Sequence, residues 1–116
     1  MFQNEPFAKE LIMLVAYTVA LDLIRSLRPV VEQLKTHDAN IADQVTRAAT
    51  SITLNIGEGS RRGGKDPKRF YRMAQGSAGE ILVALDTADA WGWKVDTAAA
   101  RKLLDRELAL LYGLCR

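Results

Sequence analysis

The sequence predicts an all-α protein: an antiparallel up-down-up-down four-helix bundle that occupies residues 1–116 as one domain. Three observations support this prediction. Apolar residues recur at steps of three and four through four stretches of the chain, the spacing that places them on one face of a helix. Capping residues, prolines and glycines separate these stretches. The connections are short, and short connections favour antiparallel neighbours in a bundle.

The first predicted helix contains the most apolar run of the chain, residues 11–21. This run is too short to span a membrane, and its acidic neighbours differ from the basic flank of a signal peptide. Pro29 either ends or kinks the helix. Leu11 and Leu14 belong to one apolar stripe, and a second stripe runs along another face. Because a chain of this length cannot bury both stripes, we expect contact with another subunit.

The second predicted helix begins after Asp38, a typical N-cap residue, and ends at Gly57 and Gly59. Residues 51–56 also show the alternation of β-branched residues that is typical of a strand. They continue the helical stripe of the preceding residues in register, however, and a lone strand would have no partner. We therefore assign them to the helix.

The third predicted helix begins with Asp66 as cap and Pro67 as first helical residue, and Gly92 closes it. The fourth begins after Asp96 and continues to the chain end with a wide leucine-rich stripe. We expect the two tryptophans that flank Gly92 to plug the end of the bundle. The single histidine, His37, is expected to be an exposed loop residue.

The composition offers few residues for catalysis or metal binding. The chain has one cysteine, Cys115, and one histidine, which excludes an intrachain disulfide, a zinc site of His and Cys ligands, and most triads. Residues 59–65 have the glycine and lysine spacing of a nucleotide-binding P-loop. Asp66, however, stands where that loop needs a magnesium-binding hydroxyl. We expect a cytoplasmic protein with no enzymatic activity, no cofactor, no metal and no membrane partner.

The charge is segregated along the chain. The formal net charge of +2 combines a window of +5 at residues 61–72 with −3 for the remainder. Aromatic residues are interleaved with the cations, and such a segment favours contacts with the phosphates of RNA or DNA. The alternative is a solvated loop with a basic rim. The nucleic-acid-binding candidates are Arg61, Arg62, Lys65, Lys68, Arg69 and Arg72.

A second group of polar residues lies beside the apolar stripes of the second and third predicted helices. Buried carboxylates in such a seam would need cationic partners, and Arg47 and Arg72 are available. We interpret the group as a structural network that fixes helix register. The alternative is a small hydrolase that uses Glu58 and Glu80 as general acid and base. The expected network comprises Gln44, Arg47, Ser51, Asn55, Glu58, Ser77 and Glu80.

Two spaced motifs carry a family resemblance. The pattern S-I-x-x-N-I-x-E-G at residues 51–59, followed by A-x-G-S-x-x-E at residues 74–80, resembles the signature of the 23S rRNA intervening-sequence proteins, a family of four-helix bundles. The resemblance extends over most of the chain. The sequence departs from the family at Gly57, where alanine is frequent, and in the length of the loop at residues 61–65.

The resemblance implies a ring-shaped homopentamer of up-down-up-down bundles without enzymatic activity. Members of the family are encoded within insertions in bacterial 23S rRNA genes and also as free-standing genes. The family is similar to the accessory variability proteins of diversity-generating retroelements, basic pentamers that bind a reverse transcriptase and nucleic acid. We therefore predict an oligomeric bundle that binds RNA or DNA non-specifically through the basic segment between the second and third helices. The alternative is an adaptor that recruits a partner protein such as a reverse transcriptase and has no direct nucleic-acid role.

Overall fold

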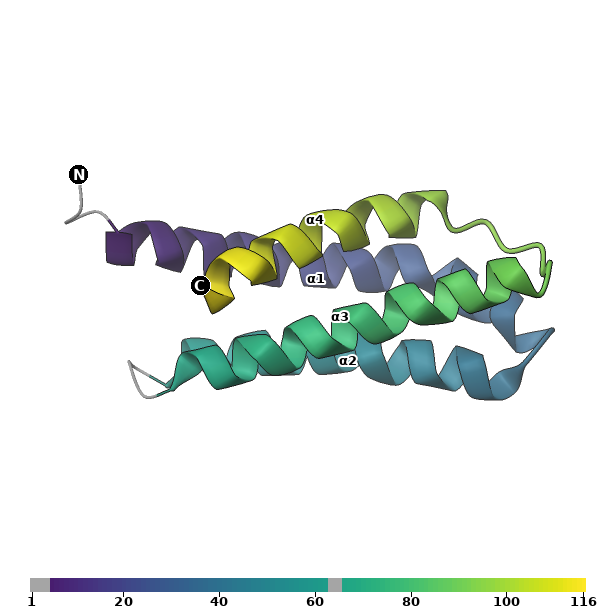
Figure 1. Cartoon of the computed structure of the whole chain (residues 1–116), viewed down its shortest axis with the longest axis horizontal. Coiled ribbons are helices and arrows are strands. Elements are labelled where there is room, and N and C mark those ends of the chain that lie inside the picture. Colours follow the sequence, from purple (N-terminus) through teal and green to yellow (C-terminus); the bar gives the residue numbers. More distant parts are fainter. Residues whose placement is uncertain (1–4, 63–65) are drawn as a thin grey trace.

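We analysed a computed structural model of the chain, which describes residues 5–62 and 66–116 (Figure 1). These residues form four helices and no strand, which confirms the all-α prediction. The helices are α1 (Glu5–Lys35), α2 (Ala39–Ser60), α3 (Pro67–Ala90) and α4 (Ala98–Cys115). Helices α1 and α3 each pack against both α2 and α4, so α1 and α3 lie diagonally across the bundle. The result is a rod with extents of 50 × 23 × 20 Å.

The connections are divided between the two ends of the rod (Figure 1). The α1–α2 turn and the α3–α4 connection lie together at one end, where the backbone N–H of Asp96 donates to Gln33 Oε1 at 2.9 Å. The end of α2 and the start of α3 lie at the opposite end. The beginning of α1 and the end of α4 meet there too, since Lys9 Nζ donates to the carbonyl of Arg116 at 3.3 Å.

Helix α1 continues through Pro29 for two further turns. Proline has no N–H to donate to Arg25 and normally disrupts a helix interior. Here Pro29 lies on the exposed side, whereas Leu27 and Val30 beside it and Leu34 beyond it are buried in the core. Apolar packing on both sides of the proline therefore keeps the two parts of α1 in one helix.

The start of α2 matches the prediction. Asp38 has extended backbone, and its carboxylate accepts the N–H groups of Asn40 and Ile41 at 2.8 and 3.0 Å. The end differs by one residue, because α2 continues past Gly57 and Gly59 to Ser60. Gly59 is required by close packing, since a Cβ there would lie 2.6 Å from the ring of Tyr71.

The end of α3 is a Schellman motif. The N–H of Trp93 donates to the carbonyl of Ala88 at 3.1 Å, and that of Gly92 to the carbonyl of Asp89 at 2.9 Å. Gly92 has a φ of +76°, in the left-handed region that the motif requires at this position and that glycine adopts without strain. The structure confirms that Gly92 closes the helix.

The other two helix starts agree with the prediction only in part. Pro67 is the first residue of α3, but the Asp66 side chain makes no capping bond. Helix α4 begins at Ala98 with Thr97 as its N-cap, so the predicted cap at Asp96 is wrong by one residue. Asp96 still contributes to capping α4, because its carboxylate accepts the N–H of Ala98 at 3.4 Å.

The core consists of aliphatic side chains from all four helices, with Leu23, Ile52, Ile81 and Leu104 at its centre. The described side chains also leave a group of large apolar residues exposed. This group comprises Phe7, Leu11, Leu14, Val15, Tyr17, Leu54, Met73, Val83, Trp91 and Tyr112. Half of it lies on α1, so one of the two predicted stripes remains uncovered. Within the described part of the chain, no helix is both long and apolar enough to cross a membrane.

Candidate nucleic-acid interface

The cations of the 61–72 window gather where α2 ends and α3 begins (Figure 1). Those that the structure describes are Arg61, Arg62, Lys68, Arg69 and Arg72; the predicted candidate Lys65 lies outside the described residues. All of them are exposed except Lys68, which is half-buried. The end of α2, the start of α3 and the described residues next to them therefore present these five candidates at one end of the rod.

Phe70 holds two of these guanidinium groups. The Cζ atom of Arg62 lies 4.6 Å from the centroid of the Phe70 ring, and that of Arg69 lies 5.6 Å from it. Each such cation–π contact contributes about 0.5–1 kcal/mol at an exposed site. Arg62 also pairs with Glu58 across one helical turn at 3.4 Å. Because Arg62 follows α2 and Arg69 lies on α3, the ring gathers charge from both sides of the connection.

The ends of α1 and α4 add further cations. Lys68 and Arg72 lie close enough to Cys115 to oppose the effect of burial, which raises the pKa of its thiol. Lys9 binds the Arg116 carbonyl at the same end, and the Arg116 guanidinium lies 5.9 Å from the ring centroid of Tyr112. We call this group the basic end; its described members are Lys9, Arg61, Arg62, Lys68, Arg69, Arg72 and Arg116.

The start of α3 strengthens the positive potential of the basic end. Asp66 has left-handed backbone at φ 52°, and its carboxylate does not cap the first turn. The N-terminus of a helix carries a partial positive charge and directs N–H groups outward, an arrangement that favours phosphate. Lys68 and Arg69 lie in that first turn. The basic end can therefore bind several anionic oxygens at once.

Three members of the expected polar network lie together between α2 and α3. The hydroxyls of Ser77 and Ser51 are 2.9 Å apart and hydrogen-bonded. Asn55 Nδ2 donates to both the hydroxyl and the carbonyl of Ser51, at 3.0 and 2.9 Å. Ser77 is buried and Ser51 is half-buried, and their hydroxyls can bond in only one register of the two helices, which is the role expected for the network.

The other four members lie elsewhere. Arg47 pairs with Asp43 at 2.9 Å, and Glu58 with Arg62. Gln44 and Glu80 border a shallow groove between α2 and α3. Both glutamates are exposed, so the expectation of buried carboxylates in this seam is wrong. Among the described residues, no group of three or more His, Cys, Asp and Glu side chains is placed to hold a metal ion.

Among the residues whose burial the structure describes, the buried carboxylate is that of Glu107, which the sequence did not lead us to expect. Its side chain is fully buried, and neither carboxylate oxygen has a hydrogen-bond partner among the described residues. Burial raises the pKa of Glu107 to about 8, against a small opposite effect of Arg106. The signal was present in the sequence, because Glu107 lies three residues after Leu104 and four before Leu111 on the buried stripe.

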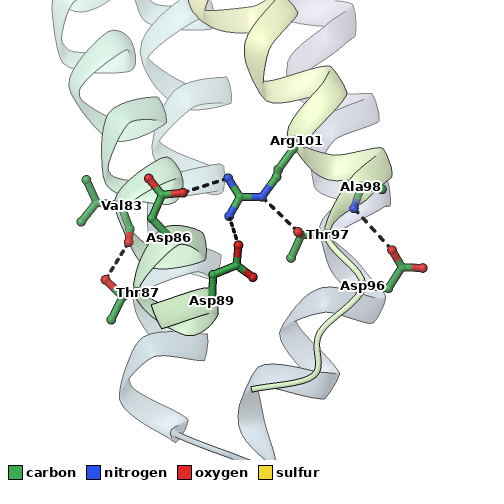
Figure 2. A network of polar contacts seen from close by, with 8 residues as sticks. All are labelled: Val83, Asp86, Thr87, Asp89, Asp96, Thr97, Ala98 and Arg101. Atoms are coloured by element: carbon green, nitrogen blue, oxygen red, sulfur yellow. Dashed lines mark hydrogen bonds and ion pairs between the residues drawn. The ribbon is translucent and has the colours of Figure 1, made fainter. Parts of the chain in front are cut away.

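A separate polar network joins α3 to α4 at the end of the rod opposite the basic end (Figure 2). Arg101 extends from α4 to two carboxylates of α3, with 2.9 Å to Asp86 and 3.5 Å to Asp89. Its Nε also donates to the hydroxyl of Thr97 at 3.1 Å. The network fixes the start of α4 against the last turns of α3.

Fold and site together define a small helical bundle with charge concentrated at one end. The model of the 23S rRNA-intervening sequence protein family matches residues 13–108, most of the chain. The chain therefore belongs to this family, which is one of intervening-sequence proteins rather than a class of enzymes. Comparisons with curated proteins and with solved structures found no significant match.

Proposed function

We propose that this protein is a non-enzymatic, oligomeric helical bundle that binds RNA or DNA through the phosphates of the backbone. The observation that carries the proposal is the basic end, where residues from four helix ends bring seven described cations together. Membership of a family whose name refers to 23S rRNA agrees with a nucleic-acid partner.

The geometry favours contacts with phosphates over recognition of bases. Arginine and lysine side chains at the surface neutralise phosphates without reading sequence. Phe70 is half-buried, and the guanidinium groups of Arg62 and Arg69 lie over its ring, where they would compete with a stacking base. About four to six phosphate contacts would make the affinity strongly dependent on salt, with a slope of log K against log salt near −0.7 to −0.9 per contact.

Filter binding to a structured RNA and to a DNA duplex at 50 and 200 mM salt tests the proposal. We expect binding at low salt that weakens by at least tenfold at high salt. The double variant Arg69→Gln/Arg72→Gln should reduce the magnitude of the slope of log K against log salt by the contribution of about two phosphate contacts. These two side chains are exposed on α3, so the exchange leaves the core intact.

The matched control is Lys94→Gln/Lys102→Gln, which removes the same charge from exposed positions outside the basic end. It should leave the salt slope near that of the wild type. Absence of binding at 50 mM salt, or equal loss in both double variants, would contradict recognition by the basic end and would leave only a solvated basic rim.

We further propose that up-down-up-down bundles assemble into a ring, as a homopentamer. The outer faces of α1 and α3 point away from each other, because the two helices lie diagonally in the bundle. Each outer face exposes large apolar residues: Leu11 and Leu14 on α1, Met73 and Val83 on α3. Two different apolar faces on opposite sides of one subunit suit head-to-tail contacts, which form a ring when the rotation between neighbouring subunits closes.

Gly76 supports the same interface. A glycine within a helix costs about 1 kcal/mol relative to alanine. The position lies on the exposed side of α3 between Met73 and Val83. Apart from its two neighbours in the chain and the backbone of its own helix, no described atom lies within 4 Å of where its Cβ would be. Packing inside the subunit therefore does not explain the glycine, whereas close approach of another subunit would.

Light scattering on two variants, Leu14→Glu and Val83→Glu, tests the assembly. The wild type should have the mass of a pentamer and each variant that of a monomer. Mixed together, the variants should form heterodimers, because one keeps an intact α1 face and the other an intact α3 face. A monomeric wild type would refute assembly, and a mixture that remains monomeric would refute the head-to-tail contact.

The second candidate function is a protein-protein adaptor. It is favoured by Trp91, whose side chain is 70% exposed at the end of the rod opposite the basic end. A pull-down in which one stoichiometric partner survives nuclease treatment would support the adaptor. Loss of every partner after nuclease treatment would instead favour nucleic-acid binding alone.

A further inference from the structure

Three aromatic rings are stacked where the α1–α2 turn meets the α3–α4 connection. The rings of His37 and Trp93 are 5.2 Å apart and nearly parallel, with an interplanar angle of 6°. Those of Trp93 and Trp91 are 6.5 Å apart at an angle of 13°. Trp93 packs against the core, whereas Trp91 is exposed. The expectation that both tryptophans plug the bundle is therefore wrong for Trp91.

The backbone fixes the position of this stack. The Schellman motif places Trp91 as the C-cap of α3 and Trp93 immediately after Gly92, with three hydrogen bonds from residues 91–93 to the last turn. The exposed indole is thus held by a rigid helix end and by contact with a second ring. A rigid aromatic surface loses little conformational entropy on binding, which is why tryptophan is frequent at interaction hot spots.

The charge around this end is negative. The last turn of α3 has no basic residue, so the negative end of the helix dipole is not neutralised by its own side chains. Asp86 and Asp89 share one guanidinium, that of Arg101, and both remain largely exposed (Figure 2). Among residues 32–38 and 86–101, five acids face three bases, not counting His37. The potential here has the opposite sign to that of the basic end.

We propose that the stack of Trp91, Trp93 and His37 docks an arginine-bearing segment of a partner protein. A guanidinium stacks flat on an indole and gains a cation–π contact as well as attraction to the aspartates and the helix C-terminus. Lysine would gain less, because its ammonium group is compact and strongly hydrated. A nucleobase would bring its phosphate towards the carboxylates. This docking goes beyond nucleic-acid binding and does not depend on it.

Titration of a fluorescein-labelled hexa-arginine peptide, read by anisotropy, tests the proposal. Unlabelled hexalysine serves as the competitor. We expect saturable binding of hexa-arginine and at least threefold weaker competition by hexalysine. The chain has only two tryptophans, and both belong to the stack. The unlabelled arginine peptide should therefore also change the intrinsic tryptophan fluorescence, with the same midpoint.

Two variants separate stacking from general attraction between charges. Trp91→Leu should weaken peptide binding at least fivefold, and Trp91→Phe should recover part of the loss. The control Tyr112→Leu removes an exposed aromatic ring at the basic end and should have no effect. Equal affinity of Trp91→Leu and wild type, or no saturable binding, would overturn the proposal. Direct binding of a single-stranded oligonucleotide that is lost in Trp91→Leu would also overturn it and would assign the stack to nucleobases. Filter binding of RNA to Trp91→Leu should be unchanged, so the two proposals fail independently.

Discussion

Replacing Glu107 with glutamine should remove most of the pH dependence of stability that the core imposes. The Glu107 side chain lies on α4 with no exposed surface and no hydrogen-bond partner among the described residues. The other buried titratable side chain in the described core is Tyr71, and the charge that acts on Glu107 is that of Arg106 on the same helix. Glutamine has nearly the same volume and carries no charge at any pH. The exchange therefore removes the titration of this side chain with little change in packing.

The magnitude follows from the pKa. Burial raises the pKa of Glu107 from 4.5 to about 8, so the folded protein keeps a proton that the unfolded chain releases above about pH 4.5. The contribution to stability is therefore greatest below pH 4.5, declines as the pH rises to 8 and is constant above it. At about 1.4 kcal/mol per pKa unit, the decline amounts to about 5 kcal/mol. Domains of this size have total stabilities of about 5–15 kcal/mol, so the loss is substantial.

Urea unfolding at pH 5, 6, 7, 8 and 9, at one protein concentration, measures this difference. Wild type and Glu107→Gln should differ little at pH 5, and the variant should be the more stable by several kcal/mol at pH 8 and above. Asp105→Asn is the control, since it makes the same chemical change at the exposed side of α4. Parallel pH profiles for wild type and Glu107→Gln would refute the reasoning, as would an equal flattening by Asp105→Asn.

Substitutions at four further positions probe the backbone, each measured by urea unfolding at one pH. Pro29→Ala should stabilise the protein by about 2–3 kcal/mol, because it restores a helical donor in the interior of α1; a destabilised variant would show that α1 needs the proline. Asp38→Ala should cost about 0.5–2 kcal/mol through loss of two hydrogen bonds at the start of α2, and Asp38→Asn should cost less. Gly59→Ala should cost about 1–3 kcal/mol, because its Cβ would lie 2.6 Å from the Tyr71 ring. Gly76→Ala is the control: the Cβ would enter open space in the subunit, so this variant should not destabilise the isolated fold.

Local chemistry predicted most of the helix boundaries. The caps at Asp38, Pro67 and Gly92 act through bonds or dihedral angles within four residues, so the sequence carries the information directly. Pro29 could not be resolved in this way, because its effect depends on how firmly distant apolar residues hold the helix on either side. The start of α4 was displaced by one residue, since Asp96 and Thr97 can both cap and the choice depends on the preceding loop.

The sequence predicted the part of the candidate site that consists of cations close together in the chain. The basic residues cluster because they are neighbours in the chain, whereas the approach of Lys9 and Arg116 depends on the tertiary fold. Glu58 and Glu80 lie on the exposed sides of their helices. A small rotation of a helix about its axis moves a residue from the contact between two helices to its exposed border, and the sequence does not determine that rotation. Glu107 was missed because an acid on an apolar stripe is normally assigned to the edge of that stripe.

The elongated shape of the molecule gives its charge distribution a direction. Along a rod of 50 Å, cations gather at one end and the aspartates of α3 lie at the other, so the protein would be oriented by an external field. A polyanion would therefore capture it end-on, before any short-range contact forms. End-on capture leaves the long sides of the rod unobstructed, and those sides carry the apolar faces proposed to join subunits. Copies that arrive on one strand would be aligned in parallel, which is the orientation that neighbours in a ring require.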